Sequence, residues 1–323
     1  MRRSPRARGV HWGMRFGTVA SFLSLGVLLA CSDDDPGSTG AGGAGATSSS
    51  SSSSASVTTS AGGGGGGGGA PACPVNTIEM IVSSQGGVPD RFHVRVQHEG
   101  RDAAMLFDTG SALTFLFIDD PDPVWIEDFG TIELGCDTVP VPGRGGLIDH
   151  GEVDGLPVVG ILGVDYVAAG TSLIDHDAEH IVRHPAATVL PETAGWSELP
   201  FDDVQGHMIA PVALDGEAVR LMFDTGAPHI LWLGEAGQPG DVEVETSDAK
   251  GNILTLYYGD VLLLMAGEPE TTVPVLRAPS FPYFEMTVAA LGGNIHGLLG
   301  LSALDGRRFV IDGAADRILI EPP

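Results

Sequence analysis

The sequence predicts a mainly β fold of two similar lobes with few short helices. Two strand-like apolar runs end in the same four residues, at Phe107–Gly110 and again at Phe223–Gly226. Segments with the alternation of half-buried strands flank both runs, whereas long helical periodicity is nearly absent. The sequence also matches itself in two places, which indicates that one unit is present twice.

The internal matches define the repeated unit. Residues 91–118 overlay residues 207–234 without a gap at an offset of 116 (224 − 108). Residues 160–185 overlay residues 297–322 at an offset of 137 (297 − 160), and eight of these 26 pairs are identical. Each half therefore contains one acid, then a Gly-Ile/Leu-Leu-Gly element, then a closing hairpin. We expect a tandem duplication with an N-terminal lobe at 73–190 and a C-terminal lobe at 191–323.

Residues 1–30 have the pattern of a signal peptide. A basic lead with five arginines precedes the apolar run Phe16–Ala30, which is too short for a comfortable membrane span. The run ends in Leu28–Cys31, a pattern that resembles the lipobox of bacterial lipoproteins, in which the cysteine is lipidated. The resemblance implies lipidation of Cys31 and a place in the bacterial cell envelope, facing the periplasm or the exterior. The alternative is an ordinary signal peptide followed by a chance cysteine.

Residues 31–72 are of low complexity, with seven serines at Ser48–Ser54 and eight glycines at Gly62–Gly69. Such a segment cannot bury enough apolar surface to offset its ordering entropy. We expect a disordered tether between the lipid anchor and the folded part.

The chain is strongly acidic, with 16 basic and 42 acidic residues and a formal net charge of −26. Removal of residues 1–30 takes away five arginines and leaves −31 (11 − 42). A surface of this charge repels nucleic acid and anionic lipid headgroups. We therefore expect no nucleic-acid partner, and contact with a membrane through the N-terminal lipid only.

The strands before each acid are predicted from alternation and turn residues. Phe92–Gln97 alternates apolar and polar side chains, Gly100 occupies a hairpin turn, and Ala103–Phe107 returns as a more buried strand. The second half repeats this pattern with Met208–Leu214, Asp215-Gly216 and Ala218–Phe223.

The remaining elements are short. We expect a short helix after each Gly-Ile/Leu-Leu-Gly element, around Asp165–Ala169 and Ser302–Arg307. The segment Pro185–Gln205 is the expected link between the lobes. Asp175 and Asp312, which the repeat pairs, fall in turns before the last strands and are interpreted as structural residues.

Asp108 and Asp224 are the candidate chemical groups. One Asp-Thr-Gly tripeptide is ordinary turn chemistry, because Asp caps a turn and Gly accepts positive φ. Two copies in matched contexts instead indicate a site to which each half contributes one acid. Two carboxyl groups that lie close together cannot both ionise easily, so they share a proton and act as general acid and general base.

The order of these motifs resembles the aspartic proteases, both the two-lobed pepsin-like and the half-size retropepsin-like enzymes, over most of residues 88–323. The resemblance implies acid-protease-like β-barrel lobes and an aspartic-type endopeptidase in which Asp108 and Asp224 activate a water molecule. Thr109 and Thr225 would hydrogen-bond across the lobe interface. The implied supporting residues of the loops are Thr109, Gly110, Ser111, Thr225, Gly226 and Ala227, and those of the bracing strands are Leu162, Gly163, Leu299 and Gly300.

The two motifs differ at their fourth position. Ser111 has a hydroxyl that could donate to Asp108, whereas Ala227 offers nothing to Asp224. A hydrogen-bond donor favours the ionised form of a carboxyl group. We therefore predict that Asp108 is the more readily ionised partner and that Asp224 holds the shared proton at rest.

The second half has 21 more residues than the first between its acid and its bracing strand (73 − 52). The family closes a β-hairpin flap over its substrate, and in pepsin-like members the N-terminal lobe carries that flap with a tyrosine. Here no tyrosine lies between Asp108 and Gly160. Thr246–Asn252 leading into Ile253–Tyr258 has the pattern of a turn between strands, so we expect the flap on the second lobe. A plain surface hairpin is the alternative.

Two cysteines remain after Cys31. Cys73 lies at the start of the folded part and Cys136 lies within the first lobe. Outside the inner membrane they could form a disulfide, and the alternative is a pair of unpaired core residues.

His176, His180 and His184 would line one face of a helix and suggest a metal site. The repeat overlays them on 313–321, which has the pattern of a turn entering a strand, where the three side chains cannot converge. We expect no metal and no cofactor. His229 lies five residues after Asp224 and is expected to pack rather than react.

The sequence thus predicts a monomeric, lipid-anchored protease with both lobes in one chain, acting on a peptide or protein substrate. The alternative is a catalytically inactive lipoprotein of the same fold that binds peptides or surface partners. Two intact acids favour the enzyme, because perturbed carboxyl groups gather at functional sites.

Overall fold

The computed structural model describes residues 73–85, 88–120, 122–146, 151–247 and 253–323. The expected signal peptide, Cys31 and the tether lie outside these described residues. Cys73–Pro323 falls within one compact unit. The fold is mainly β with few helices, as the sequence predicts. No helix among the described residues is both long and apolar enough to cross a membrane.

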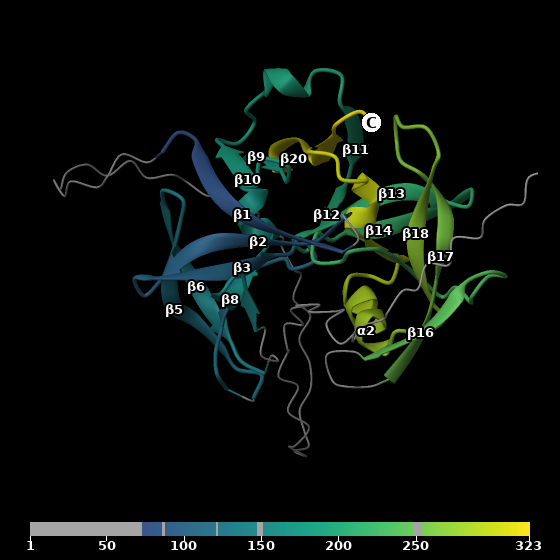
Figure 1. The fold of residues 1–323 in the computed structure, drawn as a ribbon, viewed down its shortest axis with the longest axis horizontal. Coiled ribbons are helices and arrows are strands. Elements are labelled where there is room, and N and C mark those ends of the chain that lie inside the picture. Colours follow the sequence, from purple (N-terminus) through teal and green to yellow (C-terminus); the bar gives the residue numbers. More distant parts are fainter. Residues whose placement is uncertain (1–72, 86–87, 121, 147–150, 248–252) are drawn as a thin grey trace, which may run out of the picture. The chain divides into compact units, whose positions relative to one another are not determined.

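The first half of the folded part consists of strands and one short helix (Figure 1). These elements are β1 (Asn76–Gln85), β2 (Val88–His98), β3 (Arg101–Phe107), β4 (Phe115–Phe117), β5 (Trp125–Leu134), β6 (Asp137–Arg144), β7 (Glu152–Val153), β8 (Leu156–Leu162), α1 (Val164–Val167), β9 (Thr171–Asp175) and β10 (His180–His184).

The second half repeats this order and adds a hairpin strand and a longer helix. Its elements are η1 (Pro191–Thr193), β11 (Ser197–Pro200), β12 (Asp202–Val204), β13 (His207–Leu214), β14 (Glu217–Phe223), β15 (Ile230–Leu233), β16 (Val242–Ser247), β17 (Ile253–Leu264), β18 (Thr271–Ala278), α2 (Pro282–Ala290), β19 (Gly297–Leu299), η2 (Leu301–Leu304), β20 (Phe309–Asp312), η3 (Gly313–Ala315) and β21 (Arg317–Ile320).

The hairpin that leads to each acid is where the sequence predicts it. Strands β2 and β3 pair antiparallel, and strands β13 and β14 repeat this pairing in the second half. The two turns contain consecutive residues of positive φ, at 53° and 71° for Glu99 and Gly100 and at 49° and 81° for Asp215 and Gly216. Two such residues suit the right-handed twist of a two-residue hairpin. The returning strands β3 and β14 end in buried side chains. Packing of these side chains fixes the backbone from which each acid projects.

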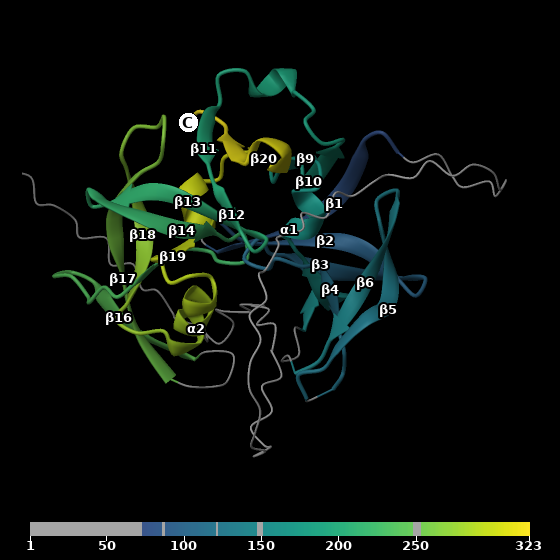
Figure 2. The ribbon, with the colours of Figure 1, turned by 180° about the vertical axis from the view of Figure 1, so that it is seen from behind.

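The halves are joined by a sheet to which both contribute. Its strands run in the order β11-β21-β20-β9-β10-β1, so the last strands of each half lie next to each other. Ile174 of β9 is opposite Phe309 of β20. Figures 1 and 2 show β9, β10, β11 and β20 close together in both views. Backbone hydrogen bonds between β9 and β20 therefore hold the two halves together, in addition to side-chain packing.

Two expectations need correction. The segment Pro185–Gln205 is not only a link, because it contains β11, which pairs with β21, and β12, which pairs with β13. The expected helix around Ser302–Arg307 is the 3₁₀ turn η2, one residue earlier, whereas α1 lies close to its expected range. The sequence reasoning also missed α2, whose central side chains pack in the core of the second half.

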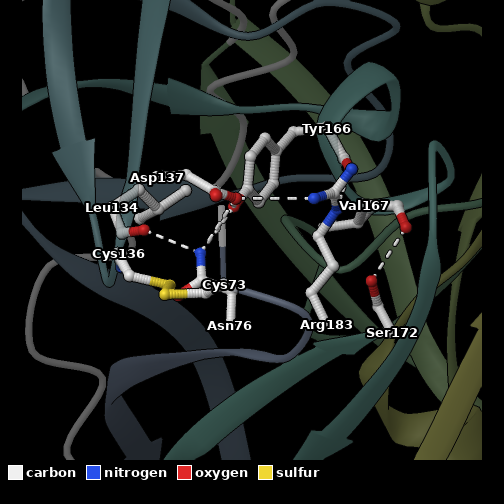
Figure 3. A network of polar contacts seen from close by, with 9 residues as sticks. All are labelled: Cys73, Asn76, Leu134, Cys136, Asp137, Tyr166, Val167, Ser172 and Arg183. Atoms are coloured by element: carbon white, nitrogen blue, oxygen red, sulfur yellow. Dashed lines mark hydrogen bonds and ion pairs between the residues drawn. A yellow bond between two sulfur atoms is a disulfide. The ribbon is translucent and has the colours of Figure 1, made fainter. Parts of the chain in front are cut away.

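A polar network ties the start of the folded part to the first half (Figure 3). Cys73 and Cys136 form a disulfide, which settles the open alternative for these cysteines. The Asn76 side-chain amide donates to the Leu134 carbonyl at 2.8 Å and to the Tyr166 hydroxyl at 3.0 Å. The Tyr166 hydroxyl donates to the Asp137 carboxylate at 2.7 Å. The network thus links β1, the β5–β6 turn and the helix α1 that follows the bracing strand β8.

Asp175 and Asp312 have the structural roles that the sequence predicts. Asp312 forms an ion pair with Arg317 at 3.1 Å, and Asp175 forms one with Arg308 at 3.5 Å. The Asp312 pair spans the turn between β20 and β21, whereas the Asp175 pair joins the two halves; in the turn after β9, Asp175 accepts a hydrogen bond from the Ala178 N–H at 2.9 Å.

Candidate active site

Asp108 and Asp224 occupy equivalent loops of the two halves. Each follows a buried strand, and its backbone N–H donates to the bracing strand, at 3.0 Å to the Leu162 carbonyl and at 3.1 Å to the Leu299 carbonyl. The bracing strands pair parallel with the strands that carry the acids, with Phe107 beside Leu162 and Phe223 beside Leu299. Each loop therefore packs on the bracing strand that the resemblance to the aspartic proteases implies.

Gly163 and Gly300 let the chain after each bracing strand pass against the loop. A Cβ on Gly163 would lie 2.8 Å from the Ser111 carbonyl oxygen, and one on Gly300 would lie 2.5 Å from the Ala227 carbonyl oxygen. Such distances are too short for a side chain. The same two carbonyls accept hydrogen bonds at 2.9 Å from the backbone N–H groups of the residues that follow, Val164 and Leu301. Only glycine fits both positions.

Thr109 and Thr225 join the two loops across the lobe interface. The Thr109 N–H donates to the Thr225 hydroxyl oxygen at 3.1 Å, and the Thr225 N–H donates to the Thr109 hydroxyl oxygen at 3.0 Å. Each hydroxyl then donates to a carbonyl of the opposite half, Thr109 to Phe223 at 3.0 Å and Thr225 to Phe107 at 2.9 Å. Both side chains are fully buried. The predicted hydrogen bonds between these threonines are confirmed.

The carboxyl groups of Asp108 and Asp224 contact each other through a side-chain hydrogen bond. Each also lies against the glycine of the opposite loop, since a Cβ on Gly110 would be 2.7 Å from Asp224 Cγ and one on Gly226 would be 2.7 Å from Asp108 Cγ. Gly110 N–H donates to Asp108 at 2.9 Å, and Gly226 N–H donates to Asp224 at 2.8 Å. Both residues are 2% exposed, so the pair is close together and almost wholly buried.

Burial and mutual repulsion perturb both acids. Desolvation raises the pKa of Asp108 well above its usual value, and the negative charge of Asp224 raises it further. Desolvation also raises the pKa of Asp224, but the hydrogen bond from Asp108 and backbone N–H groups of Gly226, Ala227 and Gly110 oppose that rise. The two carboxyl groups are therefore coupled, and the pair shares one proton.

The expectation based on Ser111 rests on a hydrogen bond from its hydroxyl to Asp108, and the structure shows a different partner for that hydroxyl. The Ser111 hydroxyl donates to the Leu113 carbonyl at 2.8 Å rather than to Asp108. A serine commonly binds a nearby backbone carbonyl in a turn, and that local bond competes with any bond to the acid. Neither Ser111 nor Ala227 therefore gives its acid a side-chain hydrogen bond.

Further titratable residues lie near the pair, and of these the sequence analysis assigned a role only to His229. Arg91 interacts electrostatically with Asp108 and Asp90, and Asp90 in turn attracts His229. His207 binds the backbone of Gly110, and desolvation lowers its pKa. The internal repeat aligns Arg91 with His207 at the offset of 116. This alignment was the sequence signal that could have revealed a polar residue near the acids in each half. His229 packs edge-on against Tyr258 at 5.4 Å between ring centroids, which is a packing contact of the kind that the sequence analysis expects.

The second half carries a hairpin without a counterpart in the described part of the first half. Strand β16 pairs antiparallel with β17 from Val242↔Tyr258 to Ser247↔Ile253, and the tip at 248–252 lies outside the described residues. Strand β17 continues into a pairing with β18, as β5 pairs with β6 in the first half. The predicted hairpin at this position is confirmed.

The three histidines of the rival metal hypothesis lie on a turn and a strand. His180 and His184 are the ends of β10, whereas His176 lies in the preceding turn and stacks against Phe92 with 6.3 Å between ring centroids. Among the described residues, no group of three or more His, Cys, Asp or Glu side chains is placed to hold a metal ion.

Comparisons with known proteins give little beyond this geometry. No family model matches the chain, and no curated protein matches it. Among solved structures, basic 7S globulin from soybean is similar to 76% of this chain and 94% of its own chain, at 12% identity and a TM-score of 0.42. A likeness of this size assigns no family to the chain.

Proposed function

We propose that this protein is an aspartic-type endopeptidase. The observation that carries the proposal is the carboxyl pair of Asp108 and Asp224, which share a hydrogen bond on two loops cross-linked by Thr109 and Thr225. A buried pair that holds one proton supplies a base and an acid at the same point, which is what peptide hydrolysis by activated water requires.

Within this proposal we assign the role of each acid from its backbone donors, because three backbone N–H groups oppose the rise in the pKa of Asp224 and two oppose the rise in that of Asp108. Asp224, the ionised partner, takes a proton from water as the water oxygen attacks the peptide carbonyl carbon. Asp108 gives its proton to the carbonyl oxygen, so a neutral tetrahedral diol forms. The diol then collapses: its C–N bond breaks, the leaving nitrogen gains a proton from Asp224, and Asp108 recovers a proton from a hydroxyl group. The pair ends with one proton, as it began.

The hairpin β16–β17 is the expected flap in this proposal. Asp241, directly before β16, forms an ion pair with the buried Arg277 at 2.8 Å, so the base of the hairpin is anchored in the second half. Tyr258 lies at that base opposite Val242 and contacts His229. Such a hairpin would close over a bound peptide and exclude water from the acids.

The test compares acid-to-amide variants that keep the size of the side chain. Purified wild-type protein is offered an unfolded protein substrate between pH 3 and 7, together with Asp108→Asn, Asp224→Asn and the control Asp102→Asn on the exposed start of β3. We expect cleavage by the wild type and by the control, loss in both site variants, and inhibition by a pepstatin-type transition-state mimic. Cleavage that survives in either site variant would refute the proposal.

A second candidate function is peptide binding without catalysis. The near-complete burial of both acids, each 2% exposed, favours it, because a substrate must reach them. The same samples distinguish the two functions: a binding protein cleaves nothing at any pH, yet retains an unfolded peptide in an equilibrium binding measurement.

We also propose that the protein is a lipoprotein anchored through Cys31 to a membrane of the bacterial cell envelope. The apolar run that ends in Leu28–Cys31 supports this proposal. In a bacterial host, labelled fatty acid should be incorporated by the wild type and not by Cys31→Ala, which should appear in the soluble fraction.

A further inference from the structure

Arg91 differs from most arginines in the described part of the chain. Seven of them form ion pairs with acidic side chains: Arg95, Arg183, Arg220, Arg277, Arg307, Arg308 and Arg317. Arg91 is half-buried but has no ion pair and no hydrogen bond from its guanidinium to any described residue. A guanidinium has five N–H donors in a planar fork, and none of those of Arg91 has a hydrogen-bond partner among the described residues.

The position of Arg91 is next to the candidate active site. It lies in the first part of β2, which pairs antiparallel with β3 so that His93 is opposite Leu106; this register places Arg91, two residues before His93, beside Asp108, two residues after Leu106. The equivalent residue of the second half is His207, which binds the backbone of Gly110 in the catalytic loop. Strand β2 also contacts η2, the 3₁₀ turn that follows the bracing strand of the other half. Arg91 is thus held at the junction of the lobes beside the acids.

We propose that Arg91 forms a subsite for a carboxylate group of the peptide substrate, next to the bond that is cleaved. This inference rests on the proposed endopeptidase function. A carboxylate matches the guanidinium fork with two parallel hydrogen bonds, and such charge-assisted pairs are stronger than neutral ones. The subsite gives the enzyme a preference for an acidic residue near the cleaved bond or for a free C-terminus.

The charged groups around Arg91 set the pH range of this preference. Asp90 is its neighbour on β2 and attracts His229, while Asp108 and Asp224 lie on the catalytic loops and share one negative charge. His207 interacts with the backbone of Gly110, and His93, two residues along β2, has its pKa lowered to about 4 by burial and then by the charge of Arg91. These groups balance the charge of Arg91 but leave its donors unused. A substrate glutamate ionises with a pKa of about 4.3, so the preference should strengthen as pH rises from 3 to 6.

The experiment uses two peptides that differ only in Glu or Gln at one position near the cleaved bond, each with a free or an amidated C-terminus. The kcat/KM of each peptide is measured from pH 3 to 7 for the wild type, Arg91→Gln and Arg91→Lys. Arg101→Gln on the exposed start of β3 is the matched control, because it removes one positive charge away from any ion pair. Scanning Glu along the peptide locates the preferred position.

We expect the wild type to prefer a carboxylate peptide by about 10- to 100-fold at pH 6, the range of one charge-assisted hydrogen-bonded pair. Arg91→Gln should abolish the preference, so its kcat/KM for the Glu peptide should fall about 10- to 100-fold more than its kcat/KM for the Gln peptide. Arg91→Lys should retain part of the preference, and Arg101→Gln should retain all of it. A preference that follows Glu identifies a side-chain carboxylate, and one that follows the free C-terminus identifies the terminal group.

Two other outcomes are distinguishable. If the wild type cleaves Glu and Gln peptides equally with either terminus, or if Arg91→Gln changes all peptides by the same factor, the subsite is refuted while the protease remains. If the wild type cleaves no peptide, the proposed function itself has failed, and the subsite fails with it.

Discussion

Thr109 and Thr225 each donate a backbone N–H to the hydroxyl of the other, at 3.1 and 3.0 Å, across the interface between the two halves. These bonds fix the relative position of two acids that come from loops 116 residues apart (224 − 108). Because the same hydroxyls also donate to carbonyls of the opposite half, loss of one side chain leaves several buried groups without partners.

The first prediction concerns this cross-link. Thr225→Val keeps the shape of the side chain and removes its hydroxyl, so the Thr109 N–H and the Phe107 carbonyl lose their partner. We expect a loss of about 1–3 kcal/mol in the free energy of unfolding, measured by urea denaturation. Thr225→Ser, which keeps the hydroxyl, should lose less. The exposed Thr131→Val is the control, and an equal loss in that variant would contradict the assigned role.

The second prediction concerns His93, which is buried on β2. Desolvation, and then the positive charge of Arg91, lowers its pKa to about 4 from an ordinary 6.5. His93 therefore binds a proton at a lower pH in the folded protein than in the unfolded chain. The contribution of neutral His93 to stability is complete above pH 6.5 and is lost as pH falls towards 4. The loss is on the order of 3 kcal/mol for a shift of this size.

His93→Ile tests this contribution, because isoleucine occupies the equivalent position 209 of the second half. The unfolding free energy of the wild type, relative to that of the variant, should fall as pH drops from 6.5 to 4 and should be constant above pH 6.5. His184→Gln, a partly exposed strand histidine, should follow the wild type in parallel. A constant difference across the whole range would show that His93 titrates alike in both states.

The sequence predicted the elements that repeat and missed the interactions that are specific to one half. The strands up to Phe107 and Phe223, the bracing strands and the threonine bonds follow from motifs that occur twice. The Ser111 hydroxyl could not be placed from its motif, because a local carbonyl competes with the acid for it. The pairing of β11 with β21 could not be predicted from local sequence, because β21 lies more than a hundred residues later in the chain.

The third prediction follows from the raised pKa of Asp108. Desolvation and the charge of Asp224 make the folded protein hold this proton to a higher pH than the unfolded chain does. The associated stability is complete below pH 3.8, the ordinary value, and is lost as pH rises towards the folded-state pKa. In Asp108→Asn this loss should disappear, so the unfolding free energy of the variant relative to wild type should increase from pH 4 to 7.

The exposed Asp102→Asn is the control for that measurement and should run parallel to the wild type. Asp224→Asn should keep the part of the decline that comes from desolvation of Asp108 and lose only the part that comes from repulsion between the two acids. A wild-type curve without any decline relative to both site variants would refute the coupling of the two acids.

The fourth prediction concerns the disulfide between Cys73 and Cys136. It closes a loop with a sequence separation of 63 residues and fixes β1 to the β5–β6 turn (Figure 3). Constraint of the unfolded chain by a loop of this length is worth about 4 kcal/mol. The double variant Cys73→Ser, Cys136→Ser should lose about that amount and become insensitive to reducing agent. Cys31→Ser should leave the unfolding transition unchanged; equal sensitivity of wild type and double variant to reductant would contradict the assignment.

The last prediction concerns Arg277, a guanidinium that is 2% exposed in the second half. Its donors reach the Asp241 carboxylate at 2.8 Å and the Asp260 carbonyl at 2.8 Å, and its guanidinium carbon lies 5.9 Å from the centre of the Trp232 ring. Asp241 is itself only 8% exposed, so Arg277→Met would leave a carboxylate without its partner in a poorly hydrated place. We expect a loss of about 3–5 kcal/mol.

The partly exposed pair of Arg220 and Asp202 is the natural comparison, since Arg220→Met should cost about 1 kcal/mol or less. The double variant Arg277→Met, Asp241→Leu should recover part of the loss, because the only carboxylate left without Arg277 is that of Asp215, which lies 3.6 Å from Arg277 and is 45% exposed. Asp241 directly precedes β16, so the single variant should also weaken the hairpin and lower kcat/KM for long peptides. A cost for Arg277→Met no greater than that for Arg220→Met would mean that Asp241 finds water once its partner is gone, and the base of the hairpin would then not depend on this pair.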